Sequence, residues 1–468
     1  MPDHDDSPLY WPIARLKEAY AAGELSPVEV TEEVIARIDR FNPVLHAYLA
    51  RLDAAARDQA RAAEAAWRDG EAGPLCGIPV SIKDTFPLAG AVTTYGSALF
   101  ADNLTPADSG VVRRLRAAGA IFPGKTNAAE FGQSATTDNL LGREARNPWD
   151  TGRTPGGSSG GAAASVAAGL AVGAVGADGG GSIRIPAAFT GLYGIKPTYG
   201  SCRDEGGFAA MSDFIAAGPL TWRAADSRII LELMAERDLP RTPIDRRLRI
   251  AWCPRPEKAP VDPGVAAVIA AAVANLAELG HDVEEVELPL GGWADAFDAL
   301  VLAEEGAARG HFLDSDPERL TDYERKSLIA ARQVTAEDVA RAHRAHDAYR
   351  ARISSLFETY DLLVLPTTAT TAFPVQQRPR EVAGQRVSWL WGAFPATAQF
   401  NVAGNPAASL PCGLTHGLPV GLQIVAAWHQ EALLLNLSED LETAIGFDVA
   451  GLRASWALAA SGATSAAQ

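Results

Sequence analysis

The sequence predicts an α/β fold arranged as one large domain. Helical and strand-like patterns alternate along the chain. The 468 residues are 47% hydrophobic and 21% charged, which is typical of a soluble globular protein with a large core. No Pro/Gly/Ser-rich or charged stretch is long enough to separate domains. We therefore expect a single domain over 1–468, with a helical region over about 1–70 and a Gly/Ser-rich core over about 75–225.

The individual elements follow from local patterns. Ser26 to Glu29 form a capping box with proline at the first helical position, so a helix is expected to begin there and to end near Asn42-Pro43. The run GIPVSI over 77–82 predicts a buried strand that delivers Lys83 at its end, where a side chain can enter a cleft. Later patterns predict a helix over 111–118, a strand over 120–122, a helix over 263–279 ended by Gly280, a strand over 283–288, and a disordered, low-complexity tail over 457–468.

The segment 160–177 reaches the length of a membrane span, with Ser165 as its single polar residue. Its side chains are nearly all Gly, Ala and Val, which are too small to be strongly hydrophobic. We interpret it as a close-packed helix that ends at Gly169 and is followed by a buried strand. No membrane association is expected.

Charge and cysteine content indicate which binding partners and which cellular compartment to expect. The formal net charge of -16 gives a surface that repels phosphate backbones and anionic lipids, so nucleic-acid binding is not expected. The four cysteines lie far apart and form no CxxC, which predicts reduced, buried thiols and no metal site. The acidic N-terminus MPDHDDSPLYWP lacks the pattern of a secretory signal, and we expect a cytoplasmic protein.

Two motifs with well-known chemistry occur in the wrong context. Residues 119–126 match the phosphate-binding pattern GxxxxGK[ST], but the first glycine follows a helix and the next residues are strand-like, which is the reverse of a phosphate loop. Lys125 is then a structural or wall residue. Residues 156–160 contain GxSxG, the pattern of a nucleophile elbow, which needs a strand before it and a histidine partner. The preceding segment reads as a loop. His343 and His346 lie on a charged helix, where solvated side chains are expected.

A third motif is the run of glycines that precedes Ser182. Of the 43 glycines, 14 fall within residues 152–200, and three of them directly precede Ser182. Consecutive glycines allow backbone N–H groups to converge near a hydroxyl, which is how an oxyanion hole is built. Ser182 is therefore the candidate nucleophile of an acyl-transfer reaction. Its base would be a lysine made neutral by burial, and Lys83 follows an apolar strand. A surface lysine, or one paired with Asp84, is an equal alternative on this segment alone.

Several long stretches resemble the amidase signature family, whose members carry a serine, a second serine in a cis peptide and a lysine. The similarity spans most of the chain. The segments that carry it are GIPVSIKDT ending at Thr85, GKTNAAEFG at 124–132, GGSSGGAAASVAAG at 156–169, GADGGGSIRIPAAFTGLYGIKPTYG at 176–200, NVAGNPAASLPCG from Asn401 and GLPVGLQIV ending at Val425. The resemblance implies a large mixed central β-sheet covered by helices on both faces, with residues after about 225 completing the sheet and a substrate funnel.

Carried over position by position, the resemblance implies roles for individual residues. Ser182 becomes the nucleophile, Ser158 the bridging serine after a cis Gly157-Ser158 bond, and Lys83 the general base. One departure is Ala177, where the family usually has threonine. The N–H groups of the loop would form the oxyanion hole, and nearby side chains would support it: Gly179, Gly180, Gly181 and Ser182 as donors, with Ser159, Asp178 and Arg184 as supporting residues.

The family resemblance implies amide-type hydrolysis without a cofactor or metal. The expected substrate is a small carboxamide or carbamate, and the alternative is the A subunit of a glutamine-dependent tRNA amidotransferase. Two segments, 201–214 and 387–400, would form the funnel walls, with the first as a mobile loop. Their side chains suggest an apolar or aryl substrate, although packing in the core is an equal alternative: Phe208, Met211, Trp389, Trp391, Phe394 and Phe400. We expect a monomer or a homodimer.

Overall fold

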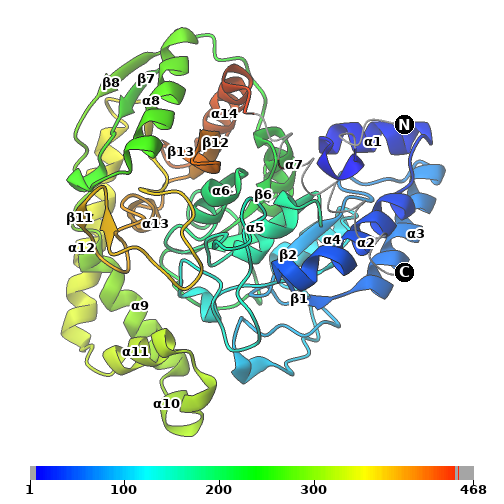
Figure 1. Cartoon of the computed structure of the whole chain (residues 1–468), viewed down its shortest axis with the longest axis horizontal. Coiled ribbons are helices and arrows are strands. Elements are labelled where there is room, and N and C mark those ends of the chain that lie inside the picture. The colour runs from blue at the N-terminus through cyan, green and yellow to red at the C-terminus, as the bar shows by residue number, and fades with distance from the viewer. Residues whose placement is uncertain (1–6, 448–451, 453–468) are drawn as a thin grey trace.

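One mixed β-sheet forms the centre of the molecule. The computed structural model describes residues 7–447 and 452, so the tail predicted to be disordered lies outside the described residues. In the described residues the sheet has eleven strands in the order β1-β3-β2-β4-β6-β5-β12-β13-β9-β7-β8. Helices flank it on both sides (Figure 1). The predicted α/β fold with a large mixed central sheet is confirmed.

The strands include two long C-terminal ones and a small separate hairpin made of β10 and β11. Their bounds are β1 (Tyr48–Arg51), β2 (Val80–Lys83), β3 (Gly124–Thr126), β4 (Gly173–Asp178), β5 (Tyr193–Lys196), β6 (Ala216–Thr221), β7 (Arg249–Trp252), β8 (Asp282–Glu285), β9 (Leu362–Pro366), β10 (Glu381–Val382), β11 (Gln385–Arg386), β12 (Ala407–Thr415) and β13 (Leu418–Ala426).

The helices begin with a bundle at the N-terminus, and short 3-10 turns lie between several of them. The α-helices are α1 (Ile13–Ala22), α2 (Pro27–Leu45), α3 (Asp53–Asp69), α4 (Gly110–Ala117), α5 (Gly160–Ala167), α6 (Arg184–Thr190), α7 (Ala224–Ala235), α8 (Pro263–Glu278), α9 (Ala294–Arg309), α10 (Phe312–Ser315), α11 (Asp322–Ala331), α12 (Ala336–Leu356), α13 (Ala398–Val402) and α14 (Glu431–Ile445). The 3-10 turns are Pro8–Tyr10, Ala98–Phe100, Glu130–Gly132, Pro256–Lys258 and Pro317–Arg319.

The register of the central strands places two charged residues at one edge of the sheet. Strand β2 runs parallel to β4, with Ile82 opposite Val175, and parallel to β3, with Lys83 opposite Thr126. Because the carboxyl ends of parallel strands meet at the same edge, Lys83 at the end of β2 lies beside the end of β4, where Asp178 begins the glycine loop. This edge is where a site can form.

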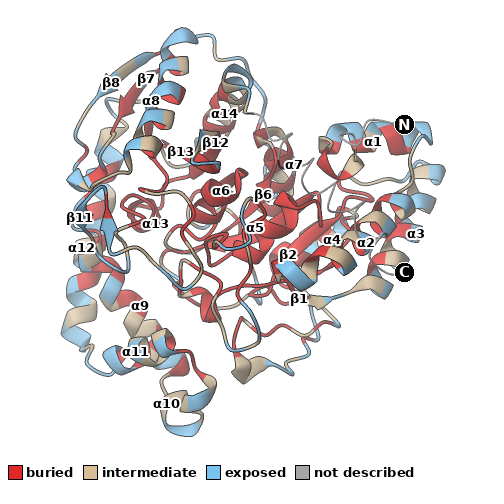
Figure 2. Cartoon of the chain, viewed as in Figure 1, coloured by how far each residue is buried: buried red, intermediate tan, exposed pale blue. Residues whose placement is uncertain are grey.

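The small residues of α5 allow it to pack directly against the sheet. Every residue of α5 is buried, and Figure 2 shows α5, α6 and β2 within the buried centre. The hydroxyls of Ser81 on β2 and Ser165 on α5 are 2.8 Å apart and join the two elements. Gly169 then has a φ of 66°, which ends the helical segment before β4. The prediction of a short helix followed by a buried strand is confirmed.

Four predictions of element bounds need correction. The strand expected over 120–122 is reduced to a single bridge between Ile121 and Pro79, and the regular strand is β3, because Pro123 has no N–H to donate to a ladder. Helix α2 continues past Pro43 to Leu45, since the N–H of His46 still donates to the carbonyl of Asn42. The strands expected over 77–82 and 283–288 occupy Val80–Lys83 and Asp282–Glu285.

His346 differs from its predicted solvated state. It lies on the face of α12 that packs into the protein, is 5% exposed, and its Nε2 is 2.9 Å from the carbonyl oxygen of Val402. His343, three residues earlier, is exposed as expected. His346 belongs to the buried stripe of α12 with Ala342, Tyr349 and Ile353, whereas His343 lies just outside that stripe. The charge pattern alone does not reveal where the buried stripe ends.

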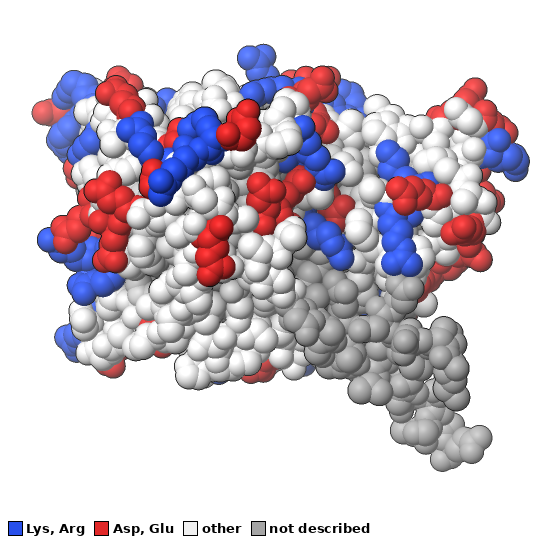
Figure 3. Space-filling view, turned by 90° about the horizontal axis from the view of Figure 1, so that it is seen from above, with Lys and Arg blue, Asp and Glu red and all other residues white. Residues whose placement is uncertain are grey.

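The surface mixes charges of both signs. On the face seen in Figure 3, acidic and basic side chains are interspersed. All four cysteines are buried and unpaired, as predicted. Within residues 7–447 and 452, no helix combines the length and apolar character needed to cross a membrane.

The close approach of α5 generates a first prediction. A Cβ at Gly161 would overlap the backbone of Asn127, whereas a Cβ at Gly142 would meet nothing within 4 Å. We expect Gly161→Ala to lower the free energy of unfolding by about 1–3 kcal/mol, because overpacking forces the backbone apart. Urea denaturation of both variants measures it. Equal stability of Gly161→Ala and the control Gly142→Ala would contradict this packing.

Candidate active site

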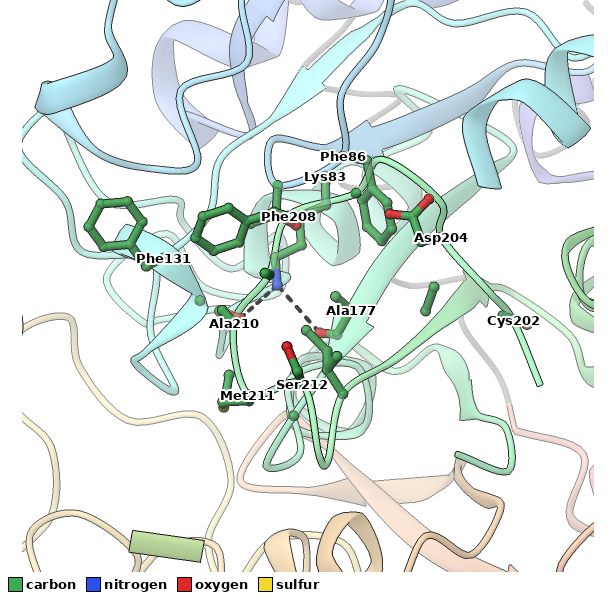
Figure 4. Close-up of a pocket in the computed structure, with 18 of the residues that line it drawn as sticks. Lys83, Phe86, Phe131, Ala177, Cys202, Asp204, Phe208, Ala210, Met211 and Ser212 are labelled. Carbon is green, nitrogen blue, oxygen red and sulfur yellow. Dashed lines mark hydrogen bonds between the residues drawn. The ribbon is translucent and has the colours of Figure 1, made fainter. Parts of the chain in front are cut away.

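Lys83 reaches into the site from the end of β2. Its side chain is 1% exposed, and Nζ donates to Ser158 Oγ at 2.7 Å and to the carbonyl of Ala177 at 3.3 Å. Figure 4 shows its amine in the middle of the pocket, between Phe208 and Phe86. Burial lowers the pKa of Lys83 to about 7, against an opposing attraction from Asp178. The amine is therefore able to accept a proton near neutral pH, and the surface-lysine alternative is excluded.

Ser158 lies in the turn before α5, after a cis Gly157-Ser158 peptide bond. It is 1% exposed and accepts the hydrogen bond from Lys83. The neighbouring Ser159 donates its Oγ–H to the carbonyl of Ala177 at 3.2 Å and its backbone N–H to the carbonyl of Ser182 at 3.2 Å. Ser159 thus ties the Ser158 turn to β4 and to the Ser182 turn. Since Ala177 contributes only backbone atoms here, its replacement of threonine leaves these contacts intact.

Ser182 follows the glycine loop and precedes α6. Its side chain retains accessible surface, with the residue 7% exposed. The hydrogen bonds among the described residues include none between Ser158 Oγ and Ser182 Oγ. Catalytic hydrogen bonds in enzymes without substrate are often long and shorten only in the reacting complex.

The backbone of the glycine loop offers unpaired donors, though not the full predicted set. The N–H of Gly181 donates to Asp178 Oδ1 at 2.7 Å, so it supports the loop itself. The prediction that Gly181 contributes to the oxyanion hole is corrected on that ground, because a carboxylate already satisfies its donor. The N–H groups of Gly179, Gly180 and Ser182 donate to no acceptor in the described residues. These three can serve a developing oxyanion.

A buried ion pair supports this loop, as predicted for Asp178 and Arg184. Arg184 Nη2 lies 2.8 Å from Asp178 Oδ1, and both side chains are fully buried. Asp178 Oδ2 also accepts the N–H of Ile183 at 3.1 Å. Burial alone would raise the pKa of the Asp178 carboxyl, but the charge and hydrogen bonds of Arg184 hold that pKa well below its usual range. Asp178 is therefore ionised throughout the physiological range.

Three residues of the C-terminal region complete the support, and no sequence pattern assigned them this role. Asn401 donates to Asp178 Oδ1 at 2.9 Å, and Gln423 accepts from Arg184 at 2.6 Å. The hydroxyl of Thr397 donates to the carbonyl of Gly180 at 2.7 Å. The sequence held one signal for two of them, because Asn401 and Gln423 fall inside the C-terminal segments that carry the family resemblance. No local pattern connects them to a loop about 220 residues earlier.

Another buried lysine, to which the sequence analysis gave no role, lies near the ion pair. Lys196 on β5 donates to the carbonyl of Pro197 at 2.8 Å. Burial and then the positive charge of Arg184 lower the pKa of Lys196 to about 7, despite the attraction of Asp178. Two lysines of the molecule therefore titrate in the same pH range.

Each glycine before Ser182 faces a side chain from a distant segment. A Cβ on Gly179 would lie 2.7 Å from the thioether of Met211, one on Gly180 would lie 3.0 Å from Trp391, and one on Gly181 would lie 2.6 Å from Thr397. The three glycines are thus required for close approach as well as for backbone freedom. Met211 and Trp391 lie at the loop, as the sequence predicted for the two wall segments.

A cavity of about 330 Å³, with a lining that is more apolar than polar, adjoins Lys83 and Ser158. Its wall includes Phe86, Phe131 and Phe208, whose rings are visible in Figure 4. Phe208 stacks on Phe131 and on Tyr95, with ring centroids 5.7 and 4.5 Å apart. The sequence predicted Phe208 as a wall residue and missed Phe86 and Phe131, which come from segments with no aromatic clustering.

The remaining predicted wall residues lie elsewhere. Phe394 and Phe400 are 1% and 0% exposed and belong to core clusters, so the prediction that they contact substrate is wrong for both, and the alternative of core packing holds. Trp389 is 46% exposed and packs against the guanidinium of Arg378 at 4.7 Å. Sequence spacing could not separate these residues from Trp391, because segment 387–400 turns repeatedly and exposes its side chains in no regular period.

The two competing motifs form neither a phosphate loop nor a nucleophile elbow. Lys125, of the phosphate-loop pattern, is fully buried, pairs with Asp84 at 2.9 Å and donates to the carbonyl of Phe86 at 2.7 Å. The GxSxG segment follows a loop, as expected, and its serine is Ser158. Among the described residues no cluster of His, Cys, Asp or Glu side chains is placed to hold a metal ion.

Comparison with known proteins agrees with this geometry. The sequence model of the amidase family matches residues 29–435. The chain belongs to the amidase signature family. This amidase signature enzyme is 36% identical to the A subunit of the glutamyl-tRNA(Gln) amidotransferase from Moorella thermoacetica, over 93% of the chain and 96% of that protein.

Two further similar proteins are acylamidases. The acylamidase of Rhodococcus erythropolis is 35% identical, over 93% of this chain and 95% of that protein. The crystal structure of a bacterial aryl acylamidase of the amidase signature family superposes with a TM-score of 0.85 and 26% identity, covering 97% of this chain and 99% of that one. The family assignment therefore supports hydrolysis of an amide-type C–N bond.

The buried lysine generates a pH prediction. Only the neutral amine of Lys83 can accept a proton, so kcat/KM should rise about tenfold per pH unit below pH 7 and level off above about pH 8. Steady-state kinetics between pH 5.5 and 10 measure this profile. Lys196→Met is the matched control, since it removes the other lysine of similar pKa and should keep the rise. A rate that keeps climbing to pH 10 would contradict the assignment.

The contact of Thr397 with the glycine loop generates another prediction. Thr397→Val keeps the shape of the side chain but removes the hydrogen bond that orients the Gly180 carbonyl. We expect kcat to fall by about ten- to a hundredfold with a smaller change in KM. The Gly180–Gly181 peptide that this bond orients lies between the donors of Gly180 and Ser182, and misaligned donors stabilise the transition state less. Thr397→Ser keeps the hydroxyl and should stay close to wild type. Equal kcat for all three proteins would disprove the positioning role.

Proposed function

We propose that the chain hydrolyses a carboxamide or carbamate C–N bond of an apolar or aryl substrate through an acyl-enzyme on Ser182. The observation that carries this proposal is the 2.7 Å hydrogen bond between buried Lys83 and Ser158, at the edge of the sheet where the Ser182 loop begins. A lysine with a pKa near 7 is a competent base at physiological pH.

The proposed mechanism uses only groups of this chain. Neutral Lys83 accepts a proton from Ser158, which in turn accepts the proton of Ser182 as that hydroxyl attacks the carbonyl carbon. The oxyanion is stabilised by the N–H groups of Gly179, Gly180 and Ser182. The same relay then returns the proton to the leaving nitrogen, because an amine expelled as its anion is a very poor leaving group. Water hydrolyses the acyl-enzyme by the reverse route.

The substrate class is inferred from the cavity beside the relay. Its wall carries three phenylalanines and Met211, a surface that favours an aliphatic or aromatic group over a charged one. Asp204 also lines it, but this carboxyl faces the backbone of α4, where Val111 N donates to it at 2.9 Å. The similarity to an acylamidase and an aryl acylamidase is consistent with this substrate class.

The A subunit of a glutamine-dependent amidotransferase is the alternative function. The similarity to such a protein over nearly the whole chain favours it. That role requires partner chains and glutamine, a polar substrate that an aromatic cavity accommodates poorly. Hydrolysis of glutamine in preference to anilides by the isolated chain would therefore support the alternative over our proposal.

A substrate panel tests the proposal. Aliphatic amides, anilides, aryl carbamates, ureas and glutamine are incubated with the wild-type chain and with Ser182→Ala. We expect the highest kcat/KM on anilides or aryl carbamates, and a loss of at least about a thousandfold in Ser182→Ala, because the nucleophile is removed.

The control for this panel separates loss of chemistry from loss of structure. Ser182→Ala should keep the wild-type circular dichroism spectrum and unfolding midpoint. A serine-reactive sulfonyl fluoride should label wild type and leave Ser182→Ala unlabelled. Activity retained by Ser182→Ala would refute the nucleophile, and a clear preference for acetamide-sized substrates would refute the aryl assignment.

A further inference from the structure

Met211 lies between the aromatic cavity and the loop that carries Ser182. Its Sδ and Cε approach the position of a Gly179 Cβ to 2.7 Å, so the thioether packs directly on the Gly179 backbone. Its Cε is also 4.0 Å from the corresponding position at Gly132, which itself faces Ser158 Oγ at 3.5 Å. The end of the Met211 side chain therefore lies between Gly132 and Gly179, close to the relay serine.

Met211 is one of the residues that line the cavity. Lys83, Ser158 and Gly179 contribute to the cavity wall together with Met211, whereas Ser182 is absent from the described residues that form it. A group that enters the cavity can thus reach the Lys83–Ser158 relay. Met211 lines this cavity and also packs on Gly179, in the loop that leads to Ser182.

The backbone at Met211 is held firmly, which leaves the side chain as the adjustable part. Met211 has a φ of 51°, in the left-handed region that non-glycine residues rarely adopt. Next to it, the N–H of Ser212 donates to Glu304 of α9 at 2.8 Å, and Tyr199 donates its hydroxyl to the carbonyl of Ser212 at 2.8 Å. On the other side, Phe208 is stacked on Tyr95. The methionine side chain is unbranched and has three rotatable bonds, so it can swing aside without moving this backbone.

We propose that Met211 determines specificity by acting as a movable partition between Ser182 and the aromatic cavity. In its observed position the thioether limits how far an apolar group can extend from the scissile carbonyl. On this proposal, a longer chain or ring has to displace the thioether, whereas a small group leaves it in place. This inference rests on the proposed function, and it names the residue that sets the size of the substrate.

Two substrate series test the partition. One varies the acyl group of an anilide from acetyl through butyryl and hexanoyl to phenylacetyl, and the other varies the amine of an acetamide over the same sizes. Met211→Ala removes the thioether and opens the cavity to Ser182. We expect the ratio of kcat/KM for the largest to the smallest substrate to rise at least about tenfold in one series, as apolar groups gain a buried pocket. The series that responds identifies the group that occupies the cavity.

Matched variants keep this test decisive. Met211→Leu retains a side chain of similar bulk and should keep the wild-type ratio. Met211→Gly also removes the thioether while relaxing the left-handed backbone, and it should show the same rise as Met211→Ala even if the alanine variant folds poorly. Labelling of Ser182 by a small sulfonyl fluoride confirms that each variant is folded around its nucleophile.

The outcome that overturns the partition differs from the one that overturns the proposed function. If wild type hydrolyses anilides in a Ser182-dependent manner but the size ratio of Met211→Gly equals that of wild type in both series, the partition is wrong and the function stands. If wild type shows no Ser182-dependent hydrolysis of any member, the proposed function itself fails.

Discussion

The buried ion pair between Asp178 and Arg184 is the interaction on which the candidate site depends. A charge pair removed from water is tolerated only when its remaining hydrogen-bonding capacity is satisfied. Here the Asp178 carboxylate accepts from Gly181 N and Ile183 N, and the guanidinium donates to Thr397 O and Gln423. Satisfying the pair therefore fixes the conformation of the Ser182 loop and joins it to the C-terminal strands.

The same ion pair determines which backbone N–H groups of the loop remain unpaired. Gly181 N is used to bind Asp178, which leaves its neighbours Gly179, Gly180 and Ser182 with donors free for a substrate. A loop held by its own buried carboxylate needs little rearrangement when negative charge develops, and such preorganisation is the main source of electrostatic catalysis. The glycines also admit Met211 and Trp391 to within contact of the loop, so the residues that shape the substrate space press on the backbone that performs the chemistry.

Burial gives the neighbouring lysines opposite roles. Lys83 faces Ser158 and the cavity without a close carboxylate, and its pKa is about 7. Lys125 is equally buried, but it lies 2.9 Å from Asp84, the residue that follows Lys83 in the chain. Asp84 therefore forms its ion pair with Lys125, and the hydrogen bonds of Lys83 go to Ser158 and Ala177. One lysine is then available as a base while the other stabilises the fold.

The sequence by itself determined the α/β class and the short helix and strand around Gly169, because these depend on local periodicity and glycine spacing. Glycine spacing also pointed to Ser182 as the candidate nucleophile, whereas the role of Ser158 and the choice of Lys83 rested on the resemblance to the amidase signature family. Tertiary structure alone decided which side chains meet those residues. Gln423 reaches the loop from β13, and Thr397 and Asn401 reach it from the N-cap of α13 and from within that helix. Gly181 donates to Asp178. Phe394 and Phe400 lie in the core, whereas Met211 and Trp391 contact the loop. Burial is the physical reason for this division, since it is a property of the packed molecule that no local pattern encodes, and it sets both the pKa of Lys83 and the side chains that line the cavity.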